Sequence, residues 1–129
     1  MPEVWSSPVR YVECDQQGVA FNAHYLTWAD EASNSWWESV GVPFAEVSAR
    51  GIESLVKVSS LEWTSSARWG DTVTVDAETE KVGRTSVTVR FTVRVGDRVC
   101  CVVRNTYVAI AEGRSTPWPD DVRARLTEG

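Results

Sequence analysis

The sequence predicts an α+β fold in which one antiparallel sheet of about five strands wraps around a long central helix, with a short C-terminal helix. Three observations predict it. Residues 23–40 repeat apolar side chains with the period of an α-helix. Residues 86–95 alternate apolar and polar side chains as a half-buried strand does, and other strand-like segments follow through short turns. With 129 residues, the chain is expected to form a single domain, residues 1–129, large enough to bury a core.

The first strand is expected at Pro8–Cys14, and the helix follows a short loop. Asn22 is a good N-cap because its side-chain oxygen can accept a hydrogen bond from a free amide of the first turn, and Gly41 fits the C-terminal stop. At roughly 100° per residue, one side of this helix collects apolar and small residues, with Leu26, Trp28 and Trp37 flanking them: Tyr25, Ala29, Ala32, Trp36 and Val40. So wide an apolar arc requires a helix that the sheet largely wraps.

Four more strands are predicted after the helix. The segments 86–95 and 98–111 are joined by Gly96-Asp97, a two-residue hairpin signal, and should pair antiparallel. Upstream strands at 71–82 and 52–63 connect through Gly83-Arg84 and through residues 68–71. The tail 115–129 predicts a short helix, because prolines come first, acids fall in the first turn and arginines come later, which suits the helix dipole.

Composition narrows the function classes. A net charge of -5 and a pI near 4.9 argue against nucleic-acid binding, which needs a basic face. The N-terminus has no signal-peptide pattern, and no segment is apolar for the ~20 residues that span a bilayer, so we expect a cytoplasmic protein without a membrane partner. The single histidine and the spacing of Cys14, Cys100 and Cys101 do not form a usual zinc ligand set. We expect buried free thiols at Cys100 and Cys101, and neither metal nor cofactor.

The segment from Asp15 to Ala32 carries a family resemblance. It contains Asp15-x-x-Gly18, the aromatic Phe21 before the helix start, and then the run HYLTWADEA. The later run RWGDTVTV, residues 68–75, is similar to a strand-opening Gly-Asp signature. Together these motifs resemble acyl-CoA thioesterases of the 4-hydroxybenzoyl-CoA thioesterase type. The order of elements is that of their hotdog fold over nearly the whole chain.

The resemblance implies roles for three residues. Asp15 matches the catalytic carboxylate of the family, and the backbone amide of Asn22 matches the group that binds the thioester carbonyl oxygen. Physical chemistry supports these roles, because a helix N-terminus offers unpaired amides and a positive dipole end to a developing oxyanion. Gly18 would let the loop turn tightly near the substrate. Asp15 would act either as a nucleophile or as a general base on water, and the sequence does not decide between them.

Each candidate has a structural alternative. Asp15 could simply end a strand and cap a turn, as aspartates often do. Many family members have a histidine where this chain has Asn22, whereas the histidine here is His24, which is expected to be exposed or to face another subunit. Tyr25, Trp28 and His24 are candidates for substrate binding, although Tyr25 and Trp28 could instead belong to the core. Another branch of the superfamily uses a carboxylate within the helix, which makes Asp30 and Glu31 further candidates.

Coenzyme A as the leaving group would need cations for its phosphates. The turn from Lys81 to Ser86 resembles a basic hairpin that contacts the nucleotide in the family, and Arg84 and Ser86 are the positions carried over. The alternative is that Arg84 is an exposed turn residue that contributes to solubility. An acyl carrier protein thioester is a second possible substrate.

The sequence therefore predicts an acyl-CoA or acyl-carrier-protein thioester hydrolase. The resemblance also implies a homodimer or homotetramer with its active site between one chain's helix start and the partner's strands. Two rival functions remain on the same fold. A dehydratase or hydratase would need His24 with Asp30 or Glu31, and a non-catalytic protein would bind an acyl thioester without cleaving it.

Overall fold

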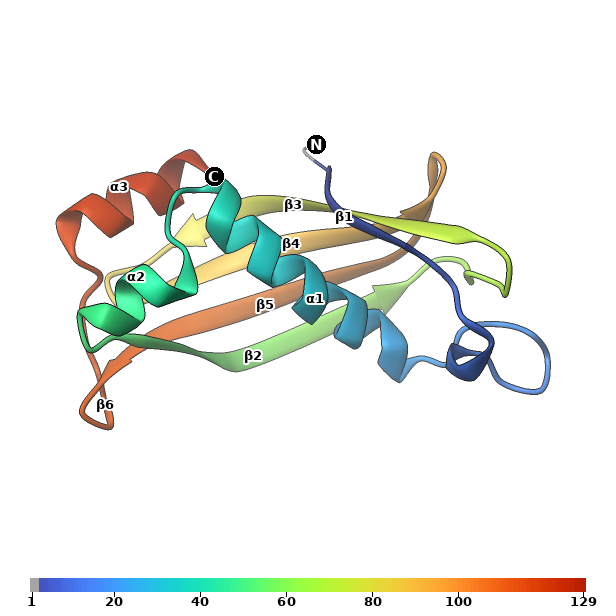
Figure 1. Ribbon diagram of the computed structural model, residues 1–129, viewed down its shortest axis with the longest axis horizontal. Helices are drawn as coiled ribbons and strands as arrows, with labels where there is room; N and C mark the ends of the chain where they lie inside the picture. Colours follow the sequence, from blue (N-terminus) through green and yellow to red (C-terminus); the bar gives the residue numbers. More distant parts are fainter. Residues whose placement is uncertain (1–2) are drawn as a thin grey trace.

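In the computed structural model, which describes residues 3–129, one antiparallel sheet curves around a 17-residue helix (Figure 1). The strands are β1 (Glu3–Pro8), β2 (Glu53–Trp63), β3 (Thr72–Val82), β4 (Ser86–Val95), β5 (Arg98–Ala111) and β6 (Arg114–Ser115). The helices are α1 (Ala23–Ser39), α2 (Phe44–Ala49) and α3 (Asp120–Glu128), with a 3-10 turn at Tyr11–Glu13. The strand order is β1-β3-β4-β5-β2, and β6 pairs with the end of β5. The predicted hotdog architecture and both predicted helices are confirmed.

The first strand lies earlier in the chain than predicted. β1 covers Glu3–Pro8 rather than Pro8–Cys14. Pro8 pairs with Thr72, the first residue of β3, so the chain beyond Pro8 runs past the end of its neighbour. There Glu13 accepts the Arg10 amide at 2.8 Å and closes the 3-10 turn instead of a strand.

The sequence predicted the C-terminal end of α1 correctly, but not the cap at its N-terminal end. Asn22 precedes the helix with helical φ and ψ of -50° and -40°, and its side chain makes no capping bond, so the predicted side-chain cap is wrong. The predicted stop at Gly41 is confirmed. Gly41 has a φ of +79°, and its amide donates to the Glu38 carbonyl at 3.0 Å while the Val42 amide donates to the Trp37 carbonyl at 2.9 Å. This is the Schellman arrangement, which favours glycine at that position.

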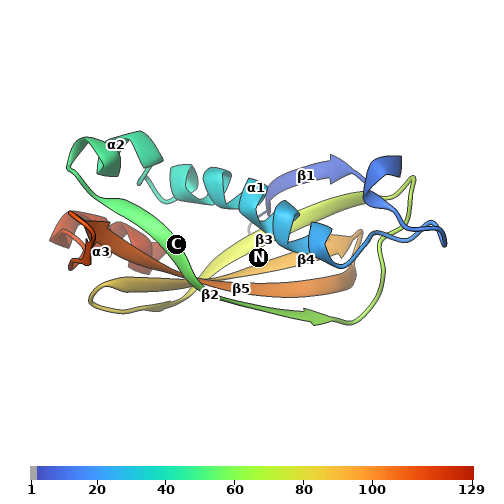
Figure 2. The same ribbon diagram turned by 90° about the horizontal axis from the view of Figure 1, so that it is seen from below.

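The core lies between α1 and the concave face of the sheet (Figure 2). The predicted apolar arc of α1 is buried at Tyr25, Ala29, Ala32 and Trp36, and it packs against alternating residues of β3, β4 and β5: Val73, Val75, Ala77, Val87, Val89, Phe91, Val93, Cys101 and Val103. Cys100 and Cys101 are buried free thiols, as expected, and burial raises the pKa of Cys101 to about 11. α2 was not predicted, because six residues are too few to show a helical period.

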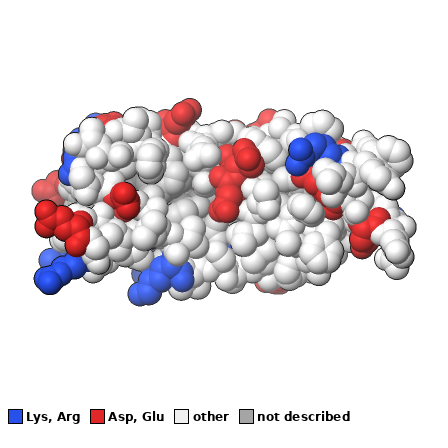
Figure 3. Space-filling model, turned by 60° about the horizontal axis from the view of Figure 1, so that its bottom comes forward, with Lys and Arg blue, Asp and Glu red and all other residues white. Residues whose placement is uncertain are grey.

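β2 forms one edge of the sheet and pairs only with β5 within the described chain. It exposes a row of apolar side chains, with Leu55 and Val58 each 53% accessible and Val56 and Trp63 nearly as much. Figure 3 shows that charged side chains are sparse over much of the face that includes this edge, apart from an acidic cluster near its middle. None of the helices in residues 3–129 is both long enough and apolar enough to cross a bilayer.

Candidate active site

Asp15 lies in a miniature hairpin that precedes α1. Cys14 bridges Ala20, and the Asp15 amide donates to the Val19 carbonyl at 2.9 Å. The turn is completed by the Gly18 amide, which donates to the Asp15 carbonyl at 3.0 Å, and Gly18 has a φ of +74° that favours glycine there. The chain returns from this loop directly into the helix start, so Asp15 and Asn22 belong to one compact unit at the same end of the molecule (Figure 1).

The Asp15 side chain is exposed and helps to shape its own loop. Its Oδ1 accepts the Gln17 amide at 2.8 Å, which is the aspartate turn motif given above as the structural alternative. One carboxylate oxygen is occupied by this bond. The second oxygen has no hydrogen bond to residues 3–129, and the exposed position leaves the group open to a substrate or to water.

Asn22 presents a free backbone amide at the start of α1. The Ala23 amide has no acceptor within residues 3–129 either, whereas the His24 amide donates to the Phe21 carbonyl at 3.0 Å and the Tyr25 amide to the Asn22 carbonyl at 3.4 Å. No acceptor for the Asn22 amide occurs in the described chain. An unpaired amide at the positive end of a helix dipole can stabilise an oxyanion.

Glu13 is a buried carboxylate beside this unit that the sequence interpretation missed. It is 3% exposed, and its Oε2 accepts the indole N–H of Trp28 at 2.8 Å. Burial raises the pKa of Glu13, but hydrogen bonds from the Arg10 amide, the Arg10 guanidinium and Trp28 outweigh burial and bring the pKa below its ordinary value. Its carboxylate is therefore ionised at neutral pH. No local signal indicates its burial, because Glu13 lies in a segment whose pattern is typical of a strand.

The three predicted substrate-binding residues lie in different environments. Tyr25 is buried, and its hydroxyl accepts the Ala67 amide at 2.9 Å, which ties α1 to the loop before β3. Trp28 is buried too and borders a pocket of about 220 Å³ together with Glu13. His24 is half-buried and packs edge-on against the Phe21 ring with 6.4 Å between centroids.

Asp30 and Glu31 face different surroundings on α1. Asp30 borders a pocket of about 230 Å³ that also includes Ser33 and Tyr107, whereas Glu31 borders the pocket beside Glu13. Burial and then the charge of Glu31 raise the pKa of Asp30. Asp30 comes six positions after His24, which puts the two side chains about 120° apart around the helix. Asp30 therefore does not share a helix face with His24, whereas Glu31, seven positions after His24, lies about 20° from it around the helix and two turns further along.

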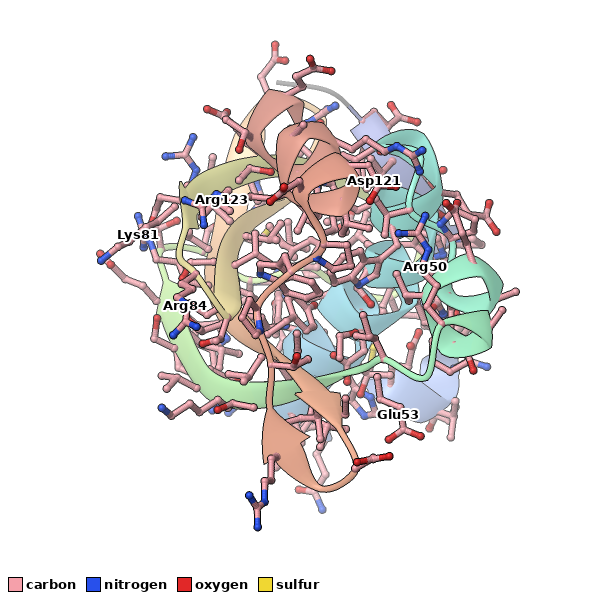
Figure 4. All side chains as sticks on the ribbon, turned by 90° about the vertical axis from the view of Figure 1, so that its left-hand side faces the viewer. Arg50, Glu53, Lys81, Arg84, Asp121 and Arg123 are labelled. Carbon is pink, nitrogen blue, oxygen red and sulfur yellow. The ribbon has the colours of Figure 1, made fainter. Side chains whose placement is uncertain are left out.

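The β3–β4 turn brings cations together at the opposite end of the molecule. A Cβ at Gly83 would approach Ser86 Oγ to 2.7 Å, so a larger residue there would require the Ser86 side chain to move. Arg123 of α3 donates to the Gly83 carbonyl at 2.9 Å, and the Trp118 amide donates to the Arg84 carbonyl at 3.0 Å. Figure 4 shows Lys81, Arg84 and Arg123 on the same side, and within the described part of the chain no carboxylate lies within salt-bridge distance of them. Arg123 was not predicted.

Residues 3–129 contain no cluster of three or more His, Cys, Asp or Glu side chains that could hold a metal ion. All the candidate site residues lie within this range.

Comparison with known proteins places this fold in a family. Residues 17–108 match the family model described as the Thioesterase superfamily, a range that begins two residues after Asp15. A protein from Thermus thermophilus superposes with a TM-score of 0.90, at 24% identity over 98% of each chain. A thioesterase from the same species, in complex with coenzyme A and Zn, gives 0.85 at 22% identity and 97% coverage of each chain. A 1,4-dihydroxy-2-naphthoyl-CoA thioesterase from Synechocystis gives 0.83 at 17% identity, covering 96% of this chain and 94% of the other. The chain belongs to the thioesterase superfamily.

Proposed function

We propose that the protein hydrolyses an acyl-CoA thioester, with Asp15 as the reacting carboxylate and the Asn22 amide as the oxyanion-binding donor. The observation that carries the proposal is the free Asn22 amide at the start of α1, beside a loop that holds an exposed aspartate. The coenzyme A complex of a similar fold supports CoA as the carrier. An acyl-carrier-protein thioester is the alternative carrier.

The chemistry needs few groups. In one route, a carboxylate oxygen of Asp15 attacks the thioester carbonyl, the C–S bond breaks, and water hydrolyses the resulting mixed anhydride. In the other route, Asp15 takes a proton from water as the oxygen of that water attacks the carbonyl. Both routes form an oxyanion that the Asn22 amide would stabilise, and both release a carboxylic acid and the CoA thiol, which takes up one proton.

The nucleotide end of CoA would bind at the β3–β4 turn. Arg84 and Ser86 supply a cation and a hydroxyl there, and Arg123 adds a second guanidinium that the Gly83 carbonyl already orients. Arginine matches phosphate oxygens in a bidentate way, and no competing carboxylate is bonded to these arginines within residues 3–129. A local cationic site of this kind is what an anionic ligand needs in a chain with a net charge of -5.

The two ends of the ligand cannot be served by one chain. The Asp15 loop contacts Arg68 and Trp69 just before β3, whereas Arg84 lies two residues after the last residue of β3. The 11 residues of β3 separate these points by about 33 Å at about 3.3 Å per residue, which is longer than a pantetheine arm. The proposed site therefore combines Asp15 of one chain with Arg84 of a second.

Pairing through β2 would supply that second chain. An antiparallel two-fold contact between β2 edges would bury their exposed apolar residues and join two sheets into one. It would also bring the helix start of one chain beside the β3–β4 turn of the other. We therefore propose a homodimer as the minimum assembly, with a homotetramer as its doubled form, in the cytoplasm.

Thiol release from a panel of acyl-CoAs, measured for wild type and Asp15→Asn, tests the function. We expect Asp15→Asn to lower turnover by about 10²- to 10⁴-fold while acyl-CoA binding is retained. Asp97→Asn, at an exposed aspartate in the β4–β5 turn, is the matched control and should keep wild-type turnover.

One observation favours a second function. Because the Asp15 carboxylate accepts the Gln17 amide, Asp15 could have a purely structural role in a protein that binds acyl thioesters without cleaving them. Binding of several acyl-CoAs with no thiol release from any of them would establish this second function and reject hydrolysis.

A further inference from the structure

Glu13 is a buried charge that the proposed chemistry does not use directly. Its oxygens accept the Arg10 amide at 2.8 Å, the Trp28 indole N–H at 2.8 Å and the Arg10 guanidinium at 3.4 Å. Removing a carboxylate from water is unfavourable, and apolar residues of similar volume often stabilise a fold equally well. The bond to the Arg10 amide closes the 3-10 turn, whereas the bond to Trp28 reaches α1 and is not part of that turn.

Burial of Trp28 does not require this partner. Two other tryptophans, Trp36 and Trp118, bury indole nitrogens that have no hydrogen-bond partner within the described chain. The fold therefore tolerates buried indoles without acceptors. Trp28, in contrast, has an acceptor, and this acceptor is a carboxylate next to the Asp15 loop.

The contacts of Glu13 converge on the base of the Asp15 loop. Its backbone carbonyl accepts the Phe21 amide at 2.9 Å, one residue before Asn22. The next residue, Cys14, forms the bridge to Ala20 that closes the loop. Through its side chain, Glu13 is also joined to Trp28 in the second turn of α1. One residue thus connects both sides of the loop base to the helix that carries the free amide.

We propose that Glu13 is a positioning residue that fixes the Asp15 loop against the start of α1, so that the Asp15 carboxylate and the Asn22 amide keep a constant separation. Its effect on hydrolysis rests on the proposed function. A loop held only by its own turn would let the two groups drift apart, and misplacement by about 1 Å can reduce turnover by about a hundredfold.

Two substitutions remove the same contact from opposite sides. In Glu13→Gln, the amide offers a single acceptor oxygen, so either the Arg10 amide or the Trp28 indole must face an NH₂ group. Trp28→Phe keeps an aromatic ring but removes the donor. We expect each variant to lower kcat by roughly ten- to hundredfold with KM unchanged, and the double variant to fall no further.

Asp76→Asn is the matched control. Asp76 is also a buried carboxylate, 4% exposed, and it accepts Arg94 Nε at 2.8 Å on β3 and β4, outside the proposed site. We expect this variant to lower Tm without changing kcat. If Asp76→Asn lowers kcat as much as Glu13→Gln does, the effect is one of general stability, and the positioning role is rejected.

Amide hydrogen exchange separates this inference from the proposed function. In Glu13→Gln, the amides of Asp15 and Phe21 should exchange faster, while amides in β4 keep wild-type rates. Faster local exchange supports the positioning role even if no acyl-CoA is hydrolysed, an outcome that would reject the hydrolase alone. Unchanged exchange at Asp15 and Phe21 would overturn the inference, whatever the turnover.

Discussion

Asn22 allows the backbone and side-chain roles of one residue to be tested separately. Its side chain makes no capping bond, so Asn22→Ala should change kcat by less than about threefold. Asn22→Pro removes the N–H, and the native φ of -50° suits proline. We expect Asn22→Pro to lower kcat by about 10²- to 10³-fold in a thiol-release assay.

The contrast between the two variants is the test. An equal loss in Asn22→Ala and Asn22→Pro would assign the role to the side chain instead of the amide. Circular dichroism and Tm of both variants would show whether α1 is preserved.

At the level of single residues, the sequence identified candidate catalytic residues but not the contacts that these residues make. Asp15, Gly18 and Asn22 stood out because of a resemblance and because of the turn and helix start around them. The sequence raised the turn role of Asp15 only as an alternative, and it did not show that Glu13 is buried, since that burial depends on the chain running past the end of β3. Arg123 is 40 residues from Gly83, so their contact carries no local signal.

At the level of elements, an ion pair joins α2 to α3. Arg50, the residue that ends α2, donates to Asp121 in the first turn of α3 at 2.8 and 2.9 Å, and Figure 4 shows the two side chains pointing toward each other. The hydrogen bond from Arg50, against a smaller effect of burial, lowers the pKa of Asp121 from 3.8 to about 2. The folded protein therefore binds this proton more weakly than the unfolded chain does.

The sign of the pH dependence follows from this lowered pKa. The stabilisation is fully present above about pH 4 and is lost as the pH falls through about 2. We expect Asp121→Asn to have a lower Tm than wild type at pH 6, with the difference disappearing near pH 2. Asp120→Asn, which changes the adjacent first-turn carboxylate, is the control, and a Tm difference for Asp121→Asn that persists at pH 2 would contradict the assignment.

Elements with a strong local pattern were predicted accurately. The period of residues 86–95, the Gly96-Asp97 turn and the Gly41 stop each follow from the local sequence, and the structure has them where predicted. β1 was misplaced because its limits are set by its partner: pairing ends where β3 begins at Thr72. α2 depends on Val47 packing into the core, which a six-residue segment does not reveal.

At the level of the whole molecule, the proposed shared site can be tested by mixing defective chains. Asp15→Asn and Arg84→Gln homodimers should each be impaired below the KM for acyl-CoA. After joint refolding, half of the dimers are mixed, and one of their two sites combines an intact Asp15 with an intact Arg84. We expect about a quarter of wild-type turnover in the mixture.

A site within one chain predicts a different result. Every chain in the mixture would then keep its own defect, and turnover would equal the average of the two parent variants. Size-exclusion chromatography with light scattering would confirm that mixed assemblies have formed.

The unpaired outer edge of β2 has a consequence for the newly synthesised protein. One edge of the 11-residue strand β2 pairs with β5, and the other edge, which carries the exposed Leu55, Val56 and Val58, is a template onto which an extended peptide can add. Pairing in the proposed β2 dimer would compete with the addition of other extended chains to this edge, which leads to aggregation. A higher concentration of newly synthesised chains would therefore have two opposite effects, since it would speed both the proposed dimerisation and aggregation.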